Sequence, residues 1–123
     1  VVLGQKNFNS VEMNQGIYFP NASSLSMPYG VATWQDWLIA ADTANSRLVG
    51  WKKSFPILSL QGAIANGIAG QIDFKTKGEN RDFGLPMRDS ICWPYGIQIC
   101  GNTAVIADSG NNRVLLWNLK PDV

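Results

Sequence analysis

One phrase of the sequence occurs twice, and this duplication limits the folds open to the chain more than any other feature. ADTANSRLVGW begins at Ala41 and ADSGNNRVLLW begins at Ala107, 66 positions later. Without a gap, the same register aligns Gly4-Gln5 with Gly70-Gln71 and Pro28-Tyr29-Gly30 with Pro94-Tyr95-Gly96. Self-similarity at a fixed period indicates a repeat architecture. The predicted units are residues 1–57 and 67–123, joined by a linker at 58–66.

Each unit predicts four β-strands and no helix. The first strand ends in Gly-Gln, and the second follows a proline, which marks strand entry. The third is apolar at consecutive positions, which is typical of a strand covered on both faces. The fourth follows a polar turn. The predicted strands are residues 1–5, 29–33, 37–42 and 47–51 in one unit and 63–71, 95–99, 103–108 and 113–117 in the other.

Four-stranded sheets that need cover on both faces and recur in series are typical of β-propeller blades. The order Pro-x-Gly, an apolar run into Ala-Asp-(Ser/Thr)-x-Asn-x-Arg, and a final Trp resembles the NHL repeat. The Gly-Gln element with its long loop is similar to extended NHL units of bacterial proteins. The first unit departs from the pattern at Ala44, where Gly is usual. The resemblance spans both units and implies an all-β propeller with two four-stranded blades per chain.

Two blades cannot close a ring, because each sheet has two faces to cover. In chain order, the last blade lacks an outer strand and the strand at 1–5 has no blade of its own. We therefore predict that three chains assemble head to tail into a six-bladed ring, a homotrimer with an exchanged strand at each joint. A fragment of a longer single-chain propeller is the alternative.

The repeated polar and aromatic residues are expected to be structural. An Asp at the end of one strand and an Arg at the start of the next can pair across the turn. The Asn between them suits a left-handed backbone, and the Trp is expected to pack between blades or under the long loop. These structural positions are Asp42, Asn45, Arg47, Trp51, Asp108, Asn111, Arg113 and Trp117.

Other aromatic residues are the candidates for ligand binding. Trp34 and Trp37 frame a turn that the second unit builds without tryptophan, so we expect two exposed indoles there. Tyr29 and Tyr95 begin the innermost strands, which the NHL resemblance places near the mouth of a central channel. Trp93 completes the candidate set. The long loops at 6–27 and 72–93 are expected to gather on one face, where binding usually resides.

The composition argues against several other functions. The sequence contains no His, which removes the commonest catalytic base and metal ligand. We predict no catalytic residues, cofactor or metal. The net charge is +1 and no basic run extends beyond Lys52-Lys53, so nucleic acid is not an expected partner. No apolar run approaches the roughly 18 residues of a membrane span.

The resemblance implies a non-enzymatic binding or scaffold module for proteins, with carbohydrates as another ligand class. The alternative is a propeller hydrolase or lyase with an oxygen-ligand metal site. Cys92 and Cys100 are expected to be free, buried thiols, because an extended segment between them would exceed disulfide reach. A disulfide formed across a sharp turn is the other reading. The compartment stays open, with a slight preference for an extracytoplasmic location.

Overall fold

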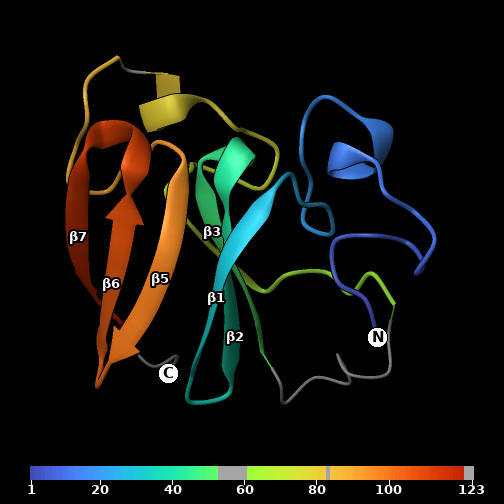
Figure 1. Ribbon diagram of the computed structural model, residues 1–123, viewed down its shortest axis with the longest axis horizontal. Helices are drawn as coiled ribbons and strands as arrows, with labels where there is room; N and C mark the ends of the chain where they lie inside the picture. Colours follow the sequence, from blue (N-terminus) through green and yellow to red (C-terminus); the bar gives the residue numbers. More distant parts are fainter. Residues whose placement is uncertain (53–60, 83, 121–123) are drawn as a thin grey trace.

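The computed structural model describes residues 1–52, 61–82 and 84–120, and these residues form two antiparallel sheets without an α-helix (Figure 1). Sheet 1 has the order β1 (Pro28–Trp34), β2 (Trp37–Asp42), β3 (Arg47–Lys52) and β4 (Gly67–Ala69). Sheet 2 has the order β5 (Pro94–Cys100), β6 (Thr103–Asp108) and β7 (Arg113–Asn118). Short 3-10 turns are η1 (Met13–Gly16), η2 (Thr43–Asn45), η4 (Glu79–Asp82) and η5 (Ser109–Asn111). The all-β prediction is confirmed.

The second, third and fourth predicted strands of each unit lie within one residue of the observed bounds. The β2–β3 hairpin pairs Asp42 with Arg47 around η2, as the repeated phrase suggested. The prediction of a left-handed backbone at Asn45 and Asn111 is wrong. Each 3-10 turn ends one residue later, so the positive φ falls on Ser46 (50°) and Asn112 (56°). The Asn side chains are instead used in hydrogen bonds.

The outermost strand of sheet 1 comes from the second sequence unit. β4 lies within the predicted strand at 63–71 and pairs with β3, with Leu48 opposite Ala69. Sheet 2 has no fourth strand among the described residues. The predicted strand at 1–5 is wrong, because this segment forms bends rather than a ladder. Figure 1 shows the reason: β7, the strand that the repeat offers as a partner, lies at the opposite side of the molecule.

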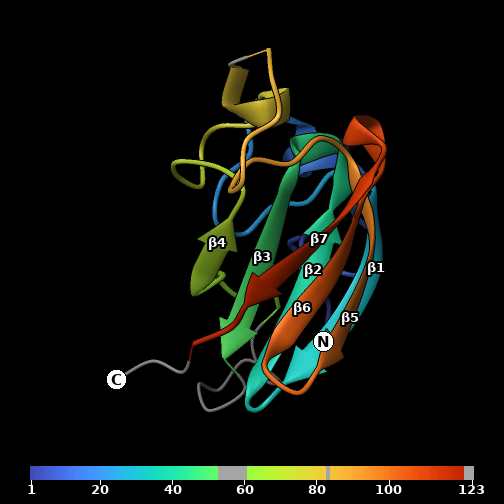
Figure 2. The same ribbon diagram turned by 90° about the vertical axis from the view of Figure 1, so that its left-hand side faces the viewer.

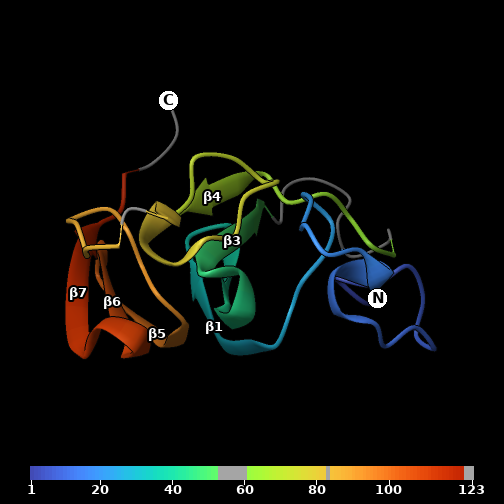
Figure 3. The ribbon, with the colours of Figure 1, turned by 90° about the horizontal axis from the view of Figure 1, so that it is seen from above.

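The two sheets fan apart from their inner strands. β1 contacts β5, and β2 also contacts β5. Seen from above, β1 and β5 lie side by side, whereas β7 lies at the left and β4 towards the top of the view, so the outer strands of the two sheets are apart (Figure 3). Figure 2 shows the same arrangement from the side, with sheet 2 in front and both inner strands on the right. The molecule is therefore a wedge of two sheets with its narrow side along β1 and β5.

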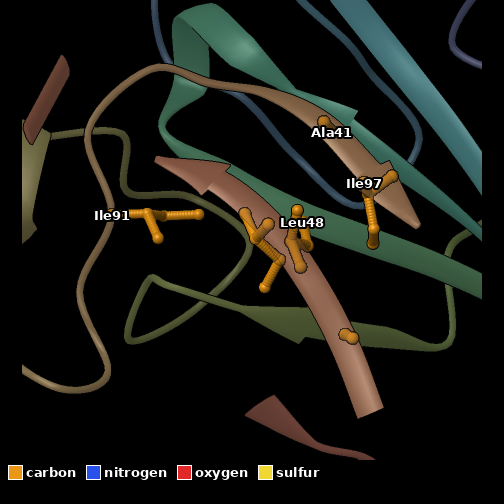
Figure 4. Close-up of a cluster of buried hydrophobic side chains, with 6 residues drawn as sticks. Ala41, Leu48, Ile91 and Ile97 are labelled. Atoms are coloured by element: carbon orange, nitrogen blue, oxygen red, sulfur yellow. The ribbon is translucent and has the colours of Figure 1, made fainter. Parts of the chain in front are cut away.

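Apolar clusters lie on both faces of sheet 1. Ala41 and Leu48 face sheet 2 and pack with Ile91 and Ile97 in one cluster (Figure 4). Ala40 belongs to a second cluster, on the other face, together with parts of the 1–27 segment. Consecutive alanines on β2 thus point to opposite, covered faces, which confirms the prediction for this strand.

The long loops repeat as closely as the strands. Gly4 and Gly70 both have φ +92°, and an added Cβ would lie 2.6 Å from Leu25 or Ile91, respectively. Only glycine fits both the backbone angle and the contact. Residues 53–57, at the end of the first predicted unit, and part of the predicted linker at 58–66 lie outside the described residues.

Candidate functional site

A buried polar network organises the turn between β2 and β3. The Asp42 carboxylate accepts hydrogen bonds from Ser26 N (2.7 Å), Asn45 Nδ2 (2.8 Å) and Arg47 Nε (2.7 Å). Both side chains of the Asp42–Arg47 pair are fully buried. Burial raises the pKa of the Asp42 carboxyl above its ordinary value, while Arg47 and these hydrogen bonds act in the opposite direction. The network fixes the turn to the loop that precedes β1.

The second unit repeats this network with more exposure. Asp108 accepts hydrogen bonds from Cys92 N, Asn111 Nδ2 and Arg113 Nε, at 2.8, 2.8 and 2.7 Å. The Arg113 side chain is 28% exposed, whereas Arg47 is 0% exposed. The predicted pairing of Asp and Arg across the turn is present in both units.

Sequence reasoning missed the asparagine pair that links each long loop to its turn. Asn14 and Asn45 exchange two side-chain hydrogen bonds, at 3.0 and 2.8 Å. Asn80 and Asn111 do the same at 2.9 and 2.8 Å. The signal was present, because Asn14 and Asn80 recur at the repeat distance. Their backbone angles, which are positive at both positions, could not be read from the sequence.

The repeated tryptophans pack as the repeat suggested, but with different partners. Trp51 is buried in the second apolar cluster and donates from Nε1 to Ala63 O at 3.0 Å. Trp117 packs against the inter-sheet cluster and donates from Nε1 to Arg88 O at 3.0 Å.

Tyr29 and Tyr95 are brought together at the narrow side of the wedge. Their rings meet edge to face, with centroids 4.8 Å apart. Tyr29 is 70% exposed, so this contact leaves most of its ring open to a partner. The strands that carry these residues, β1 and β5, begin at the end of the molecule where η2, η4 and η5 also lie (Figure 1). We call this pair the tyrosine edge.

Trp93 lies next to the strand start but is held by the fold. Its Nε1 donates to Glu79 Oε1 at 3.0 Å, and its main-chain N donates to Ser46 Oγ at 3.2 Å. The side chain is 40% exposed. It does not take part in the ring contact of the tyrosine edge.

The expected exposed pair of indoles at the β1–β2 turn is wrong. Trp34 is buried, and its Nε1 donates to Oδ1 of Asn102, in the β5–β6 turn, at 3.1 Å. Trp37 is half-buried and covers two glycines, because a Cβ at Gly50 or Gly67 would lie 2.9 or 3.2 Å from its ring. The turn itself consists of the two residues between the indoles. Both tryptophans therefore belong to the packing of the sheets.

A mainly apolar cavity of about 180 Å³ lies between the sheets. Trp34, Trp37, Leu48, Ile97 and Trp117 are among its lining residues. Binding pockets for drug-sized molecules usually have volumes of about 300–1,000 Å³. This smaller space is better explained as the gap that opens where two diverging sheets separate.

Other chemical groups are sparse in the described part of the chain. It contains no cluster of three or more His, Cys, Asp or Glu residues suited to a metal ion. Cys92 and Cys100 are free, and Cys100 is exposed, so its predicted burial is wrong. Burial, aided by Glu79 and Asp108, raises the pKa of the Cys92 thiol. Within the described ranges, no helix has the length and apolar character to span a membrane.

Comparisons with known proteins identify no family for the chain. No protein-family model matches it, and no curated protein matches it.

Proposed function

We propose that this chain is a two-blade unit of a β-propeller and that it binds proteins rather than catalysing a reaction. The sequence repeat, the shared construction of the two sheets and their fan-like divergence support the propeller (Figure 3). The resemblance to NHL repeats suggests six blades, which three chains would supply. A longer chain with further blades is the alternative source of the missing sheets.

The tyrosine edge is the observation that carries the binding proposal. Tyr29 is 70% exposed and meets Tyr95 edge to face at the strand starts. Tyrosine is enriched at protein interfaces because it combines a large apolar ring with a polar tip at little entropic cost. Sugar binding finds less support, because two of the indoles that could stack on a sugar, Trp34 and Trp51, are buried and hydrogen-bonded within the fold.

An oxygen-ligand metal enzyme finds less support. The aspartates suited to such a site, Asp42 and Asp108, already accept three hydrogen bonds each within the fold, including one from an arginine. A carboxylate that holds an arginine across a turn is poorly placed to bind a metal or to transfer a proton.

Selection from a displayed library of linear peptides would test the function, with a glycan array run in parallel. We expect peptides to be enriched on the intact protein and their affinity to fall at least about tenfold on Tyr29→Ala. Tyr18→Ala is the matched control, because Tyr18 is also exposed but lies in a long loop. Binding confined to glycans, or peptide binding that Tyr29→Ala leaves unchanged, would contradict the proposal.

A further inference from the structure

We propose that a second copy of this chain docks on the uncovered face of sheet 2, in the register that the two sheets of one chain already use. The inference rests on the propeller assembly proposed above but not on the ligand of the tyrosine edge. The contact between sheets 1 and 2, which we call the joint, is the template.

The two surfaces that form the joint each occur twice in the chain. Within the joint, Leu48 of β3 and Ile97 of β5 are 6% and 7% exposed. Their repeat counterparts, Val114 of β7 and Val31 of β1, are 64% and 65% exposed. One occurrence of each surface is therefore buried against the other. The second occurrence is exposed at Val114 on sheet 2 and at Val31 on sheet 1, where the neighbouring Ala40 is already covered by other segments of the same chain. Exposed apolar faces of this kind mark interaction surfaces.

The joint also includes a strand that crosses from one unit to the other. In sheet 1, Leu48 pairs with Ala69 and Val49 pairs with Ile68. The repeat register predicts the equivalent pairs Val114–Leu3 and Leu115–Val2 between two copies. Residues 1–5 are already shaped for this role, because Gly4 has the same positive φ as Gly70 and the same kind of contact with the loop.

An arginine in sheet 2 lacks the partner that its counterpart has. Arg47 donates from Nη1 to Phe74 O at 2.8 Å, the main chain just after β4. Arg113 Nη1 has no hydrogen bond within the described ranges, and its side chain is 28% exposed. Phe8, the counterpart of Phe74, is 69% exposed. Docking would place the carbonyl of Phe8 from the second copy beside Arg113.

Gln5, on the opposite side of the proposed interface, also lacks a hydrogen bond that its repeat counterpart makes. Gln71 donates from Nε2 to Ser46 O at 3.0 Å and to Gly78 O at 2.8 Å. Its counterpart Gln5 donates from Nε2 only to Glu12 O, at 2.9 Å, so the hydrogen bond equivalent to the one with Ser46 O is missing among the described residues. The main chain of sheet 2 in a second copy offers Gln5 the carbonyl that corresponds to Ser46 O.

A second copy is the occupant best suited to both open surfaces. The complementarity of the two surfaces is already realised once inside the chain, and each copy leaves part of each surface exposed, at Val114 and at Val31. Such head-to-tail contacts close into a ring or continue as a filament. Docking would also bring Tyr95 of one copy to Tyr29 of the next, which extends the tyrosine edge around the assembly.

Paired cysteines test the register directly. We would introduce Leu3→Cys and Val114→Cys into a protein without its native cysteines, made with Cys92→Ser and Cys100→Ser. The repeat supports Cys92→Ser, because the first unit has a serine, Ser26, at the equivalent position. A bond within one chain is excluded by distance, because these segments lie at opposite sides of the molecule (Figure 1). We expect mild oxidation to convert most of the protein into disulfide-linked oligomers. Mass spectrometry should then find a disulfide that joins the peptide containing position 3 to the peptide containing position 114.

The control moves one cysteine two residues along β7, as Leu116→Cys with Leu3→Cys. This pair keeps the same face of the strand but lies out of register, so we expect less than about a tenth of the cross-linking. Cross-linking that is absent from the first pair, or equal in both pairs, would overturn the inference.

A glycine variant tests the interface without new cysteines. A Cβ at Gly30 would lie 2.6 Å from Tyr95 O in the joint, whereas a Cβ at the counterpart Gly96 meets only Ala107 Cβ, at 3.8 Å. Gly96→Ala is therefore tolerated within one chain but collides with a docked copy. We expect an unchanged melting temperature in dilute solution and self-association weakened at least about tenfold. Unchanged self-association would overturn the inference, whereas loss of peptide binding alone would affect only the proposed function.

Discussion

At the residue scale, the repeated Asp and Arg are held in two different environments. The Asp42–Arg47 pair is fully buried, whereas Arg113 in the second pair retains contact with solvent. Identical hydrogen bonds at 2.7 Å therefore have different energetic consequences when one partner is changed. A buried charge that loses its partner is far more costly than a charge that water can reach.

The same substitution in the two units measures this difference. We expect Asp42→Asn to lower the free energy of unfolding by about 3–5 kcal/mol, because it leaves the guanidinium of Arg47 buried without a counter-charge. Asp108→Asn is the matched control and is expected to cost about 1 kcal/mol, since Arg113 can be solvated. Urea denaturation of dilute protein would measure both losses. Equal losses would show that the second network is as enclosed as the first.

Contacts within one turn could be predicted better than contacts between distant segments. The pairing of Asp42 with Arg47 follows from a turn that is bracketed by opposite charges. The partner of Asn45 could not be found in this way, because Asn14 lies in a loop whose path depends on positive backbone angles. The wrong prediction for Trp34 has a related reason: its indole donates to Asn102 in the β5–β6 turn of the second unit, a contact that no local pattern reveals.

At the scale of the elements, the indole of Trp37 fills the space beside two glycines on the neighbouring strands β3 and β4 of sheet 1. Gly50 of β3 and Gly67 of β4 are paired, and the ring of Trp37 lies over both. A methyl group at Gly50 would approach the ring to 2.9 Å, closer than ordinary contact. The two glycines are therefore required by the tryptophan rather than by backbone angles.

A double-mutant cycle tests this steric account. Gly50→Ala is expected to destabilise the protein by about 1–3 kcal/mol, because the added methyl displaces the indole. In a Trp37→Leu background the same substitution should cost less, and the difference is the coupling energy of the pair. Thermal or urea unfolding of the four proteins supplies the cycle. An unchanged cost in the Trp37→Leu background would contradict the steric explanation.

The strands could be predicted because each repeat contains its own local signals. Consecutive apolar positions in β2 and β6 indicated two covered faces, and the polar turn located β3 and β7. The segment at 1–5 could not be predicted from the same signals. It carries the sequence of an outer strand, but strand pairing requires a neighbour, and β7 of the same chain lies across the molecule (Figure 1).

At the scale of the whole molecule, the two sheets are related by the repeat and leave both outer faces of the wedge partly open. Val31 on one side and Val114 on the other are mostly exposed, although their counterparts form the core. A wedge with complementary outer faces is suited to association in series. The sequence resemblance suggests three chains and six blades.

The mass of the intact protein in solution is the most direct test of this account. We predict that light scattering coupled to size-exclusion chromatography gives three times the mass of one chain, and that dilution shifts the mass toward the single chain. A protein that remains a single chain at every concentration up to the millimolar range would contradict the assembly. It would also contradict the claim that the exposed faces of the two sheets are complementary.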